Sequence, residues 1–282
     1  MGLCCGSYDM DSKEKILTST FAQAIAIAKN ELYRDMPWRQ PLFDPYKILL
    51  SEIMLQQTQV SRVVDKYNMF LAMYPTIHDL ADAPLSDILR MWSGLGYNRR
   101  AKYLHDSVQS LKTIKTKWTY DQLVACKGIG PNTAKAVLTY SYNRPEVFIE
   151  TNIRTVILYY FYKDTPTTIA DAQIMQTVAS VIDSKNPREW YWAVMDLGAY
   201  LKQINKSLLH KVHTYKKQSV FEGSNRQLRG QIIKLLGMHH SLSLDDLQKH
   251  INDSRLSTTL HNLQNEGLIA QASEGYYLGT RL

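Results

Sequence analysis

Two glycines between two helical patterns constrain this chain more than any other feature. Residues 123–137 read LVACKGIGPNTAKAV, in which Gly128 and Gly130 flank a single isoleucine. Glycine permits a tight turn and a close backbone approach, and Pro131 suits the first position of the helix that follows. The free NH groups at that helix start can bind a phosphate, so the stretch predicts a helix-hairpin-helix that holds a phosphate backbone. The backbone contacts expected here are Gly128, Gly130, Thr133 and Lys135.

A second unusual stretch, residues 51–60, reads SEIMLQQTQV. Glu52 stands among apolar residues, so either its carboxylate turns to solvent or burial raises its pKa and makes it a proton donor. The glutamines that follow, Gln56 and Gln57 among them, carry donors and acceptors but no charge. Such side chains suit insertion into a base stack better than the binding of phosphate. The stretch therefore points to acid catalysis beside a nucleic acid.

Five motifs together resemble a known family. They are PWRQ from residue 37, DPYKILLSEIMLQQTQV from residue 44, GLGYNRRAKYL from residue 94, KGIGPNTAKAV from residue 127 and FIETNIRTV from residue 148. The chain resembles the helix-hairpin-helix DNA glycosylases, and within them most closely the A/G-specific adenine glycosylases, from about residue 37 to residue 201. The resemblance implies a base excision repair enzyme that hydrolyses the N-glycosidic bond of an adenine flipped out of mispaired DNA, opposite G or 8-oxoguanine.

The resemblance also implies roles for particular residues. Glu52 would protonate the adenine at N7, and Glu150 would stabilise the sugar cation, with Asn152 holding that carboxylate or a water. The expected base-pocket residues are Trp38, Arg39, Gln56, Asn132 and Asp196. The expected wedge residues are Gln57 and Tyr97, and further phosphate contacts are expected from Arg99, Arg100 and Lys102.

Several of these residues have plainer alternatives. Trp38 suits a hydrophobic core as well as a base pocket, and Asp196 suits a structural carboxylate. The basic run after residue 98 also fits a solvated helix face. Glu150 alternatively favours a helix start through its charge alone.

Two positions depart from the family pattern. Bifunctional relatives carry a lysine two residues after the second hairpin glycine, where this chain has Asn132, so no Schiff base can form there and the enzyme is expected to be monofunctional. Glu150 stands where the family carries an aspartate. Its extra methylene would lower the rate, be absorbed by a shifted helix, or mark a different substrate.

The chain has three cysteines, Cys4, Cys5 and Cys126, which exclude a disulfide framework and a four-cysteine metal site. Most relatives carry a four-cysteine iron-sulfur cluster after the catalytic domain, and the resemblance alone would place one here. A cluster needs thiolate ligands, so we expect an enzyme without metal or cofactor. Basic residues occupy the corresponding region, and His210 and His213 within it are taken as solvated helix residues.

Charge and composition support a nucleic-acid partner. The 282 residues are 45% hydrophobic and 21% charged, as in globular proteins, with a net charge of +7. The last third, from residue 201, holds 11 Lys and Arg against 6 Asp and Glu. We expect a monomer that binds double-stranded DNA with a mispair or lesion, without a membrane span or export signal. The expected location is the bacterial cytoplasm, at the nucleoid.

Helical spacing predicts an all-α body over residues 13–220, after a disordered leader at residues 1–12. The resemblance implies that this body is a glycosylase catalytic domain of two helical lobes. Helices are expected at residues 13–33, 45–61, 62–73, 77–80, 85–91, 98–112, 119–125, 131–142, 151–161, 170–183 and 187–202.

A small winged-helix domain of mixed α and β structure is expected after a linker at residues 221–225. Residues 226–282 show three helical patterns and two short strand patterns, with Ser243 as the N-cap of the second helix. The third helix is expected to expose Arg255, Thr258, Thr259, His261 and Asn262. Contact with DNA is favoured over a protein-interaction role because of the local basic charge. Nothing here resembles the domain with which the family inspects 8-oxoguanine.

Two further functions stay open. The same fold removes thymine or uracil from mispairs in related enzymes, and the residue at position 132 varies with substrate among them. A non-catalytic DNA-binding or damage-sensing protein is the other possibility. The presence of both Glu52 and an acid at position 150 argues against it, because a binding module needs neither.

Overall fold

The computed structural model describes residues 16, 19–204 and 220–279, which group into two compact, mostly helical units. The first unit combines Met1–Asp35 with Leu138–Lys216, and the second combines Met36–Val137 with Lys217–Leu282. Each unit is therefore assembled from two separate stretches of the chain. The predicted leader at residues 1–12 and the basic segment with His210 and His213 lie outside the described residues. In the described part, no helix is both long and apolar enough to cross a bilayer.

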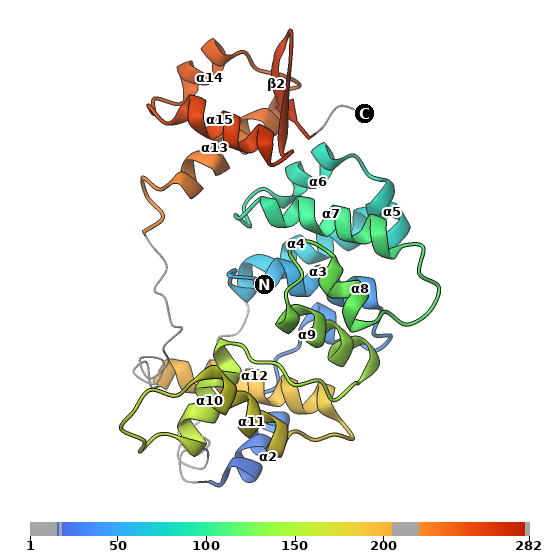
Figure 1. The fold of residues 1–282 in the computed structure, drawn as a ribbon, viewed down its shortest axis with the longest axis vertical. Helices are drawn as coiled ribbons and strands as arrows, with labels where there is room; N and C mark the ends of the chain where they lie inside the picture. The colour runs from blue at the N-terminus through green and yellow to red at the C-terminus, as the bar shows by residue number, and fades with distance from the viewer. Residues whose placement is uncertain (1–15, 17–18, 205–219, 280–282) are drawn as a thin grey trace. The chain divides into compact units, whose positions relative to one another are not determined.

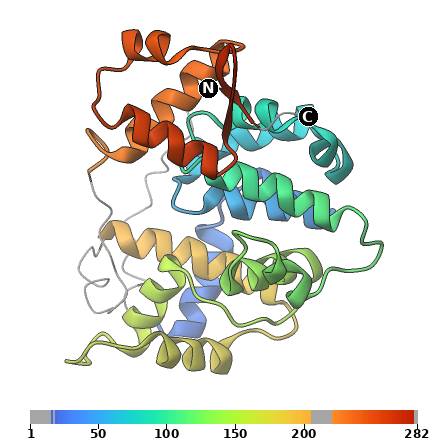
Figure 2. The same ribbon diagram turned by 45° about the horizontal axis from the view of Figure 1, so that its top comes forward.

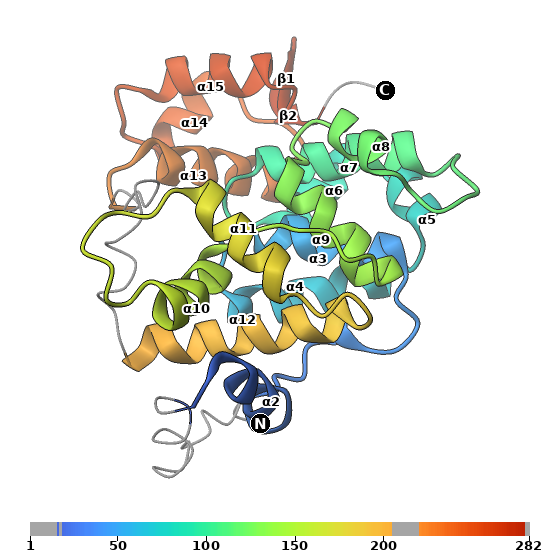
Figure 3. The same cartoon turned by 60° about the horizontal axis from the view of Figure 1, so that its bottom comes forward.

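The first unit is built around one long helix. Its helices are α2 (Phe21–Glu31), α10 (Thr151–Phe161), α11 (Asp171–Val181) and α12 (Pro187–Ile204). Helix α12 packs against both α2 and α10, as Figure 3 shows. Burial of its apolar side removes a continuous hydrophobic stripe from water, which is the main force that holds such helices together.

An extended segment leads into α10 and is fixed by Tyr191 of α12. The Tyr191 ring stacks on Phe148 with centroids 4.1 Å apart, and its hydroxyl accepts from the Phe148 NH at 3.2 Å. The same hydroxyl donates to the carbonyl of Glu146 at 3.0 Å. These contacts hold Glu146 and Phe148 against α12, just ahead of the start of α10.

Helix α12 crosses the start of α10 at very short range. A Cβ on Gly198 would overlap the backbone oxygen and carbon of Asn152. Only glycine leaves room for this approach.

The second unit holds the remaining helices of the body. They are η1 (Pro37–Arg39), α3 (Pro45–Leu55), α4 (Val60–Met73), α5 (Ile77–Asp82), α6 (Leu85–Trp92), α7 (Arg99–Leu111), α8 (Tyr120–Ala125) and α9 (Pro131–Tyr142), the last of which crosses the division between the units. Helix α3 packs on both α4 and α7 (Figure 1) and is buried over most of its length. Asp44 caps it by accepting from the Tyr46 NH at 2.8 Å, and Pro45 takes its first position.

Helix α3 ends earlier than predicted. The expected helix at residues 45–61 was wrong at its C-terminal end, because α3 stops at Leu55 and α4 starts at Val60. Gln57 in between has φ of 53°, a left-handed conformation that interrupts a right-handed helix. The four-residue segment Gln56–Gln59, which we name the QQTQ turn, is therefore a turn rather than a helical surface.

The C-terminal module, residues 220–279, contains three helices and a hairpin. They are α13 (Asn225–Met238), α14 (Leu244–His250), α15 (Leu256–Asn265), β1 (Ile269–Ala272) and β2 (Gly275–Leu278). The strands form the antiparallel hairpin drawn in red in Figure 2. An isolated bridge also joins Leu242 to Tyr276. The three predicted helices and the two strands are confirmed, as is the cap, since Ser243 accepts from the Asp246 NH at 3.1 Å. The prediction that Thr259 is exposed was wrong, because it faces the interior of the module and is 6% exposed.

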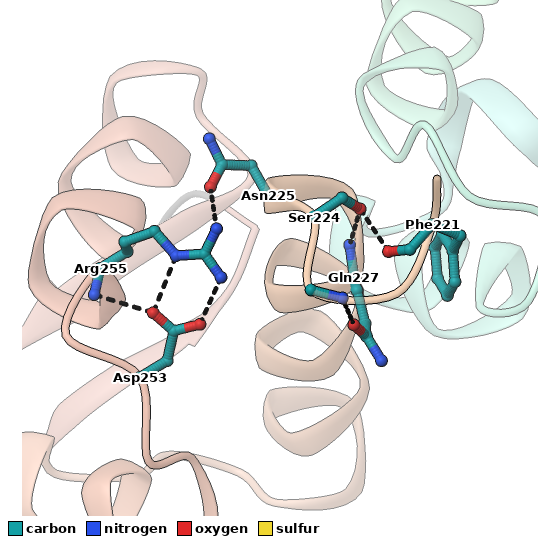
Figure 4. Close-up of polar contacts among 7 residues, drawn as sticks. Phe221, Ser224, Asn225, Gln227, Asp253 and Arg255 are labelled. Carbon is teal, nitrogen blue, oxygen red and sulfur yellow. Dashed lines mark hydrogen bonds and ion pairs between the residues drawn. The ribbon is translucent and has the colours of Figure 1, made fainter. Parts of the chain in front are cut away.

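Two local networks fix the start of α13 (Figure 4). Ser224 caps the helix by accepting from the Gln227 NH at 3.3 Å, and it donates to the Phe221 carbonyl at 2.6 Å. Arg255 donates to the Asp253 carboxylate from Nε and Nη2, at 2.9 and 2.6 Å, and from Nη1 to Asn225 Oδ1 at 3.0 Å. The beginning of α13 is thus tied to the beginning of α15.

The C-terminal module packs against α6 within the second unit. Gly279 allows this approach, since a Cβ there would lie 3.2 Å from the backbone nitrogen of Ser86. An ion-pair network adds to the contact, because Glu266 at the end of α15 accepts from Arg99 of α7 at 2.5 Å and from Arg229 of α13 at 3.0 Å. The two arginines compete with burial and lower the pKa of Glu266.

Gly198→Ala should lower the free energy of unfolding by roughly 2–4 kcal/mol, because the added methyl group must displace the backbone at Asn152. Thermal and urea unfolding followed by circular dichroism would measure the effect. The control is Gly230→Ala in the interior of α13, where no atom lies within 4 Å of the new methyl group. That change should stabilise by about 0.5–1 kcal/mol through helix propensity. Equal effects of the two substitutions would contradict the close crossing of α12 and α10.

Candidate functional site

The C-terminal end of α3 is held by a buried arginine from α7. Arg100 is 7% exposed, and its Nη1 donates to the carbonyls of Ile53, Met54 and Gln56 at 2.9, 2.9 and 2.6 Å. Its Nη2 donates to Thr58 Oγ1, the Leu95 carbonyl and the Gly96 carbonyl at 2.9, 3.2 and 3.1 Å. The carbonyls at the end of a helix lack intrahelical partners, and here a guanidinium supplies them. The prediction that Arg100 contacts phosphate was wrong, because its donors are turned inward to these acceptors.

The guanidinium of Arg100 joins two turns that carry the predicted wedge residues. One is the QQTQ turn, with Gln57, and the other is the segment Ser93–Asn98, which we name the GLGY turn, with Tyr97. Both residues have positive φ, 53° and 48°, which is costly for side chains other than glycine and persists only where surroundings enforce it. Burial lowers the pKa of Arg100 to about 10, so it keeps its charge at neutral pH.

The QQTQ turn is also bonded to the hairpin. Gln56 Nε2 donates to the Gly128 carbonyl at 3.3 Å and to Thr133 Oγ1 at 3.2 Å. Gly128 has φ of 91°, and a Cβ there would overlap the Tyr103 ring, so glycine is required. Gly130 has no such constraint and accepts from the Ala134 NH at 2.9 Å as α9 begins. The predicted helix-hairpin-helix is confirmed, and Gln56, expected in the base pocket, connects this hairpin to α3.

Glu52 lies on α3, one turn before the QQTQ turn, and its side chain is half-buried between the buried residues Ser51 and Ile53. Helix α3 also contacts η1, which carries Trp38 and Arg39. Both of these are buried, and the Trp38 ring meets Tyr67 edge-on with centroids 5.4 Å apart. Trp38 thus has the contacts of a core aromatic, and its role in a base pocket stays a prediction.

The remaining predicted contacts in the second unit are at the surface or paired. Arg99 has a half-exposed side chain in the network with Glu266, and Lys102 pairs with Asp106 at 2.7 Å. Asn132 is exposed in the first turn of α9, and Lys135 is half-buried one turn along.

Glu150 immediately precedes α10 in the first unit. It occupies the N-cap position, but its side chain makes no capping hydrogen bond. The carboxylate is therefore not used to satisfy the free NH groups of the helix by a capping bond. The plainer alternative, that Glu150 favours the helix start through its charge alone, stays a prediction. Burial raises the pKa of Glu150, and nearby Arg154 opposes that rise. Arg154 is itself held by Asp171 through two bonds of 3.0 and 2.7 Å.

Asn152 is oriented by Lys202, a residue that the sequence analysis did not assign. Lys202 Nζ donates to Asn152 Oδ1 at 3.2 Å. Since an ammonium only donates, the amide oxygen faces Lys202 and the Nδ2 donors face away from it. Burial, helped by the charge of Arg34, lowers the pKa of Lys202. The signal for this contact was the spacing of Gly198 and Lys202, four residues apart and so on one face of α12.

Asp196 is almost fully buried and bonded to Arg34. Arg34 Nε donates to Oδ1 at 2.6 Å, and the Arg34 NH donates to Oδ2 at 3.2 Å. The contacts are those of a structural carboxylate, and its expected place in the base pocket stays a prediction.

An iron-sulfur cluster does not fit this chain. Such a cluster takes four thiolates, and the chain has three cysteines, of which Cys126 is buried directly after α8. Over the described ranges, no three His, Cys, Asp or Glu side chains are grouped so that they could hold a metal ion.

Comparison with known proteins defines the class of this fold and hairpin. Residues 50–185 match the family described as HhH-GPD superfamily base excision DNA repair protein, so the chain contains an HhH-GPD superfamily domain. This range includes the QQTQ turn, the hairpin and the start of α10. Several proteins similar to this chain are named adenine DNA glycosylase.

The protein from Buchnera aphidicola subsp. Baizongia pistaciae is 33% identical over 174 residues, covering 60% of this chain and 48% of the relative. The protein from Mycolicibacterium smegmatis is 27% identical over 280 residues, covering 86% and 90%. The human protein is 29% identical over 181 residues, covering 59% and 33%. The chain thus spans half or less of the Buchnera and human relatives and most of the Mycolicibacterium relative.

Solved structures share the fold. A structure of a thermostable thymine-DNA glycosylase superposes with a TM-score of 0.55 at 23% identity, covering 67% of this chain and 88% of that one. A trapped endonuclease III–DNA covalent intermediate superposes with a TM-score of 0.50 at 18% identity, covering 72% and 91%. At these identities the likeness establishes the helical fold.

Arg100→Lys should lower the free energy of unfolding by about 3 kcal/mol or more, because one ammonium cannot replace a forked guanidinium at six acceptors. Chemical unfolding monitored by tryptophan fluorescence would show this. Arg99→Lys is the matched control on the same helix, and since its ion pair is half-exposed it should cost less than about 1 kcal/mol. Similar costs for the two variants would contradict the structural role of Arg100.

Glu150→Gln should stabilise the protein at pH values above the ordinary pKa of a glutamate. With its pKa raised in the folded state, Glu150 binds more protons folded than unfolded between the two pKa values, so stability falls as pH rises through that window. Glutamine removes this loss, and the difference from wild type should vanish at low pH, where both side chains are neutral. Unfolding free energies measured across pH test this, with the exposed Asp164→Asn as control. A constant difference at all pH values would contradict it.

Proposed function

We propose that the chain is a monofunctional DNA glycosylase that releases adenine from mispaired duplex DNA, with G or 8-oxoguanine as the opposite base. The observation that carries the proposal is the bond from Gln56 to the hairpin, which ties a DNA-backbone binding element to the helix end that bears Glu52 and Gln57. The proposed acid Glu52, the proposed wedge residue Gln57 and the phosphate-binding hairpin are thereby held in fixed positions relative to one another. The relatives named adenine DNA glycosylase support adenine as the base.

Glu52 is the proposed general acid. An adenine extruded from the duplex is a poor leaving group, and protonation at N7 lets the glycosidic bond break with the electrons moving onto the base. The half-buried position of Glu52 on an apolar helix suits a carboxyl group that delivers a proton. Gln57 and Tyr97 are the proposed wedge, held in strained turns that need no rearrangement on binding.

Glu150 is the proposed stabiliser of the sugar cation that remains. A carboxylate shielded from water interacts strongly with a developing positive charge, and Glu150 is half-buried directly after the buried residues Phe148 and Ile149. Asn152, fixed by Lys202, directs its amide donors to hold that carboxylate or the attacking water. Water then adds to the sugar carbon, leaving an abasic site.

The absence of an amine at position 132 supports hydrolysis without strand cleavage. Asn132 is exposed at the start of α9, where a lysine would be free to attack the sugar. The proposed enzyme uses water in that step and forms no Schiff base there.

The C-terminal module is proposed to be a winged-helix domain that contacts DNA, joined to the glycosylase domain at residues 221–225. Three helices followed by an antiparallel hairpin, with the Leu242–Tyr276 bridge, are the parts of such a domain. The proposed partner is double-stranded DNA, bound by a monomer.

The function is tested with duplexes carrying A opposite 8-oxoguanine, A opposite G, and G opposite T or U, each treated with alkali to cleave abasic sites. We expect cleavage at adenine alone, lost at least about 100-fold in Glu52→Gln because general acid catalysis contributes that much. Cleavage at T or U would instead assign a mismatch pyrimidine glycosylase. Tight binding with no cleavage would assign a DNA-binding protein.

Asn132→Lys should create an intermediate that borohydride traps, because the new amine can displace the base and bond to the sugar. The wild-type protein should give no trapped species on the same duplex. Denaturing electrophoresis of the protein–DNA adduct measures this, and Thr133→Lys, one residue along the same helix, is the control. Trapping by the wild type would contradict the monofunctional assignment.

A further inference from the structure

A cavity of about 1050 Å³ lies in the second unit, between the two wedge turns and α13. Its lining includes Gln57 and Tyr97 from the wedge turns and Gln227 and Gln231 from α13. Glu52, Trp38 and Arg39 are not among the lining residues. The cavity is therefore separate from the proposed excision site, although it shares the wedge with it. Its volume lies just above the range of roughly 300–1,000 Å³ for ligand pockets.

The chemistry of the lining fits an anion that carries an aromatic ring. Among the described residues that line the cavity, six are Arg or Lys and none is Asp or Glu. Arg100 is bonded to the carbonyls of the wedge turns, and Arg99 and Arg229 share Glu266. The positive charge offered to an anion is therefore that of Arg62, Arg226 and Lys234. Two of the lining residues, Tyr97 and Phe221, are aromatic. Aromatic and guanidinium planes stack on bases while cations bind phosphate, so the combination favours a nucleotide over an acidic peptide.

Arg226 connects α13 to the wedge. Its Nη1 donates to the Tyr97 hydroxyl at 2.8 Å, and its guanidinium carbon lies 5.5 Å from the centroid of the Tyr97 ring and 5.9 Å from that of Phe221. The wedge residue and the C-terminal module thus form one surface. The network of Arg99, Arg229 and Glu266 holds this surface together at the other side of α13.

We propose that this cavity binds the nucleotide opposite the excised adenine, and that α13 of the C-terminal module reads it. The inference rests on the proposed function, in which Gln57 and Tyr97 fill the gap left by the flipped base. The unpaired partner base then lies against the wedge, on the side away from Glu52. Gln231 and Lys234 are both exposed on α13 and would contact its base edge and phosphate. In this way α13 supplies a contact to the opposite strand.

The test uses the full chain and two duplexes that differ only in the opposite base. Both carry a tetrahydrofuran abasic analogue, opposite guanine in one and opposite a second tetrahydrofuran in the other. Fluorescence anisotropy at fixed salt gives the two affinities. We expect the wild type to bind the guanine duplex about tenfold more tightly, as stacking and hydrogen bonding of one base would give.

The variant is Gln231→Ala with Lys234→Ala, and we expect it to bind the two duplexes with nearly equal affinity. Its matched control is Gln248→Ala with Lys249→Ala, the same residue types exposed on α14 and outside the cavity, which should keep the tenfold ratio. Thermal unfolding of both variants shows that each is folded. An unchanged ratio in the α13 variant, or equal loss in the α14 control, would overturn the proposal.

Adenine release measured on the same protein preparations separates the two ideas. A wild type that releases adenine but does not distinguish the two duplexes overturns the cavity proposal alone. A wild type that distinguishes them, with the ratio lost in the α13 variant, but releases no adenine overturns the proposed function alone.

Discussion

The burial of the Arg100 guanidinium is the interaction on which the candidate site in the second unit depends. One side chain satisfies the carbonyls at the end of α3, part of the QQTQ turn and part of the GLGY turn. Taking a charge out of water is expensive, and six acceptors together with the ring faces of Trp92 and Tyr97 offset that cost. These bonds hold Gln57 and Tyr97 in the left-handed backbone conformation, which is unfavourable for both residues in an unconstrained turn. Rigidity in the wedge comes from this buried charge.

The two carboxylates proposed for catalysis are supported in different ways. Glu52 belongs to a helix of the second unit whose end is fixed by Arg100 and by the Gln56 bond to the hairpin. Glu150 belongs to the first unit, where Tyr191, Gly198 and Lys202 of α12 fix the segment around it. Helix α12 therefore sets the geometry of the proposed cation stabiliser. Glu150 stands where the family has an aspartate, and the position of its longer side chain depends on these contacts of α12.

Much of the fold could be predicted from sequence because helical spacing is a local property. The helices after residue 60 begin and end within about two residues of their predicted bounds, and Asp44, Ser224 and Ser243 are capping residues of the expected kind. The end of α3 was missed because nothing near residue 56 in the sequence shows that an arginine 44 residues later takes its carbonyls.

The predictions for individual site residues also failed where a role depends on contacts between residues that are distant in the sequence. Arg100 lies in a basic run, and only tertiary packing separates a buried arginine from an exposed one such as Arg99. The contact of Lys202 with Asn152 spans 50 residues, and the packing of Thr259 inside the C-terminal module depends on how three helices meet. Chemistry that depends on residue type, such as Glu52 in an apolar helix and the glycine hairpin, was visible in the sequence. Contacts that depend on distance in space were not.

We propose that Arg100 holds the wedge turns in the conformation that stabilises an extruded base. This is measured by the fluorescence of 2-aminopurine placed next to the target adenine, because unstacking of that neighbour on base extrusion raises its emission. We expect a clear rise with the wild-type protein and with Arg99→Lys, and little or no rise with folded Arg100→Lys at saturating protein. An equal rise with Arg100→Lys would contradict it.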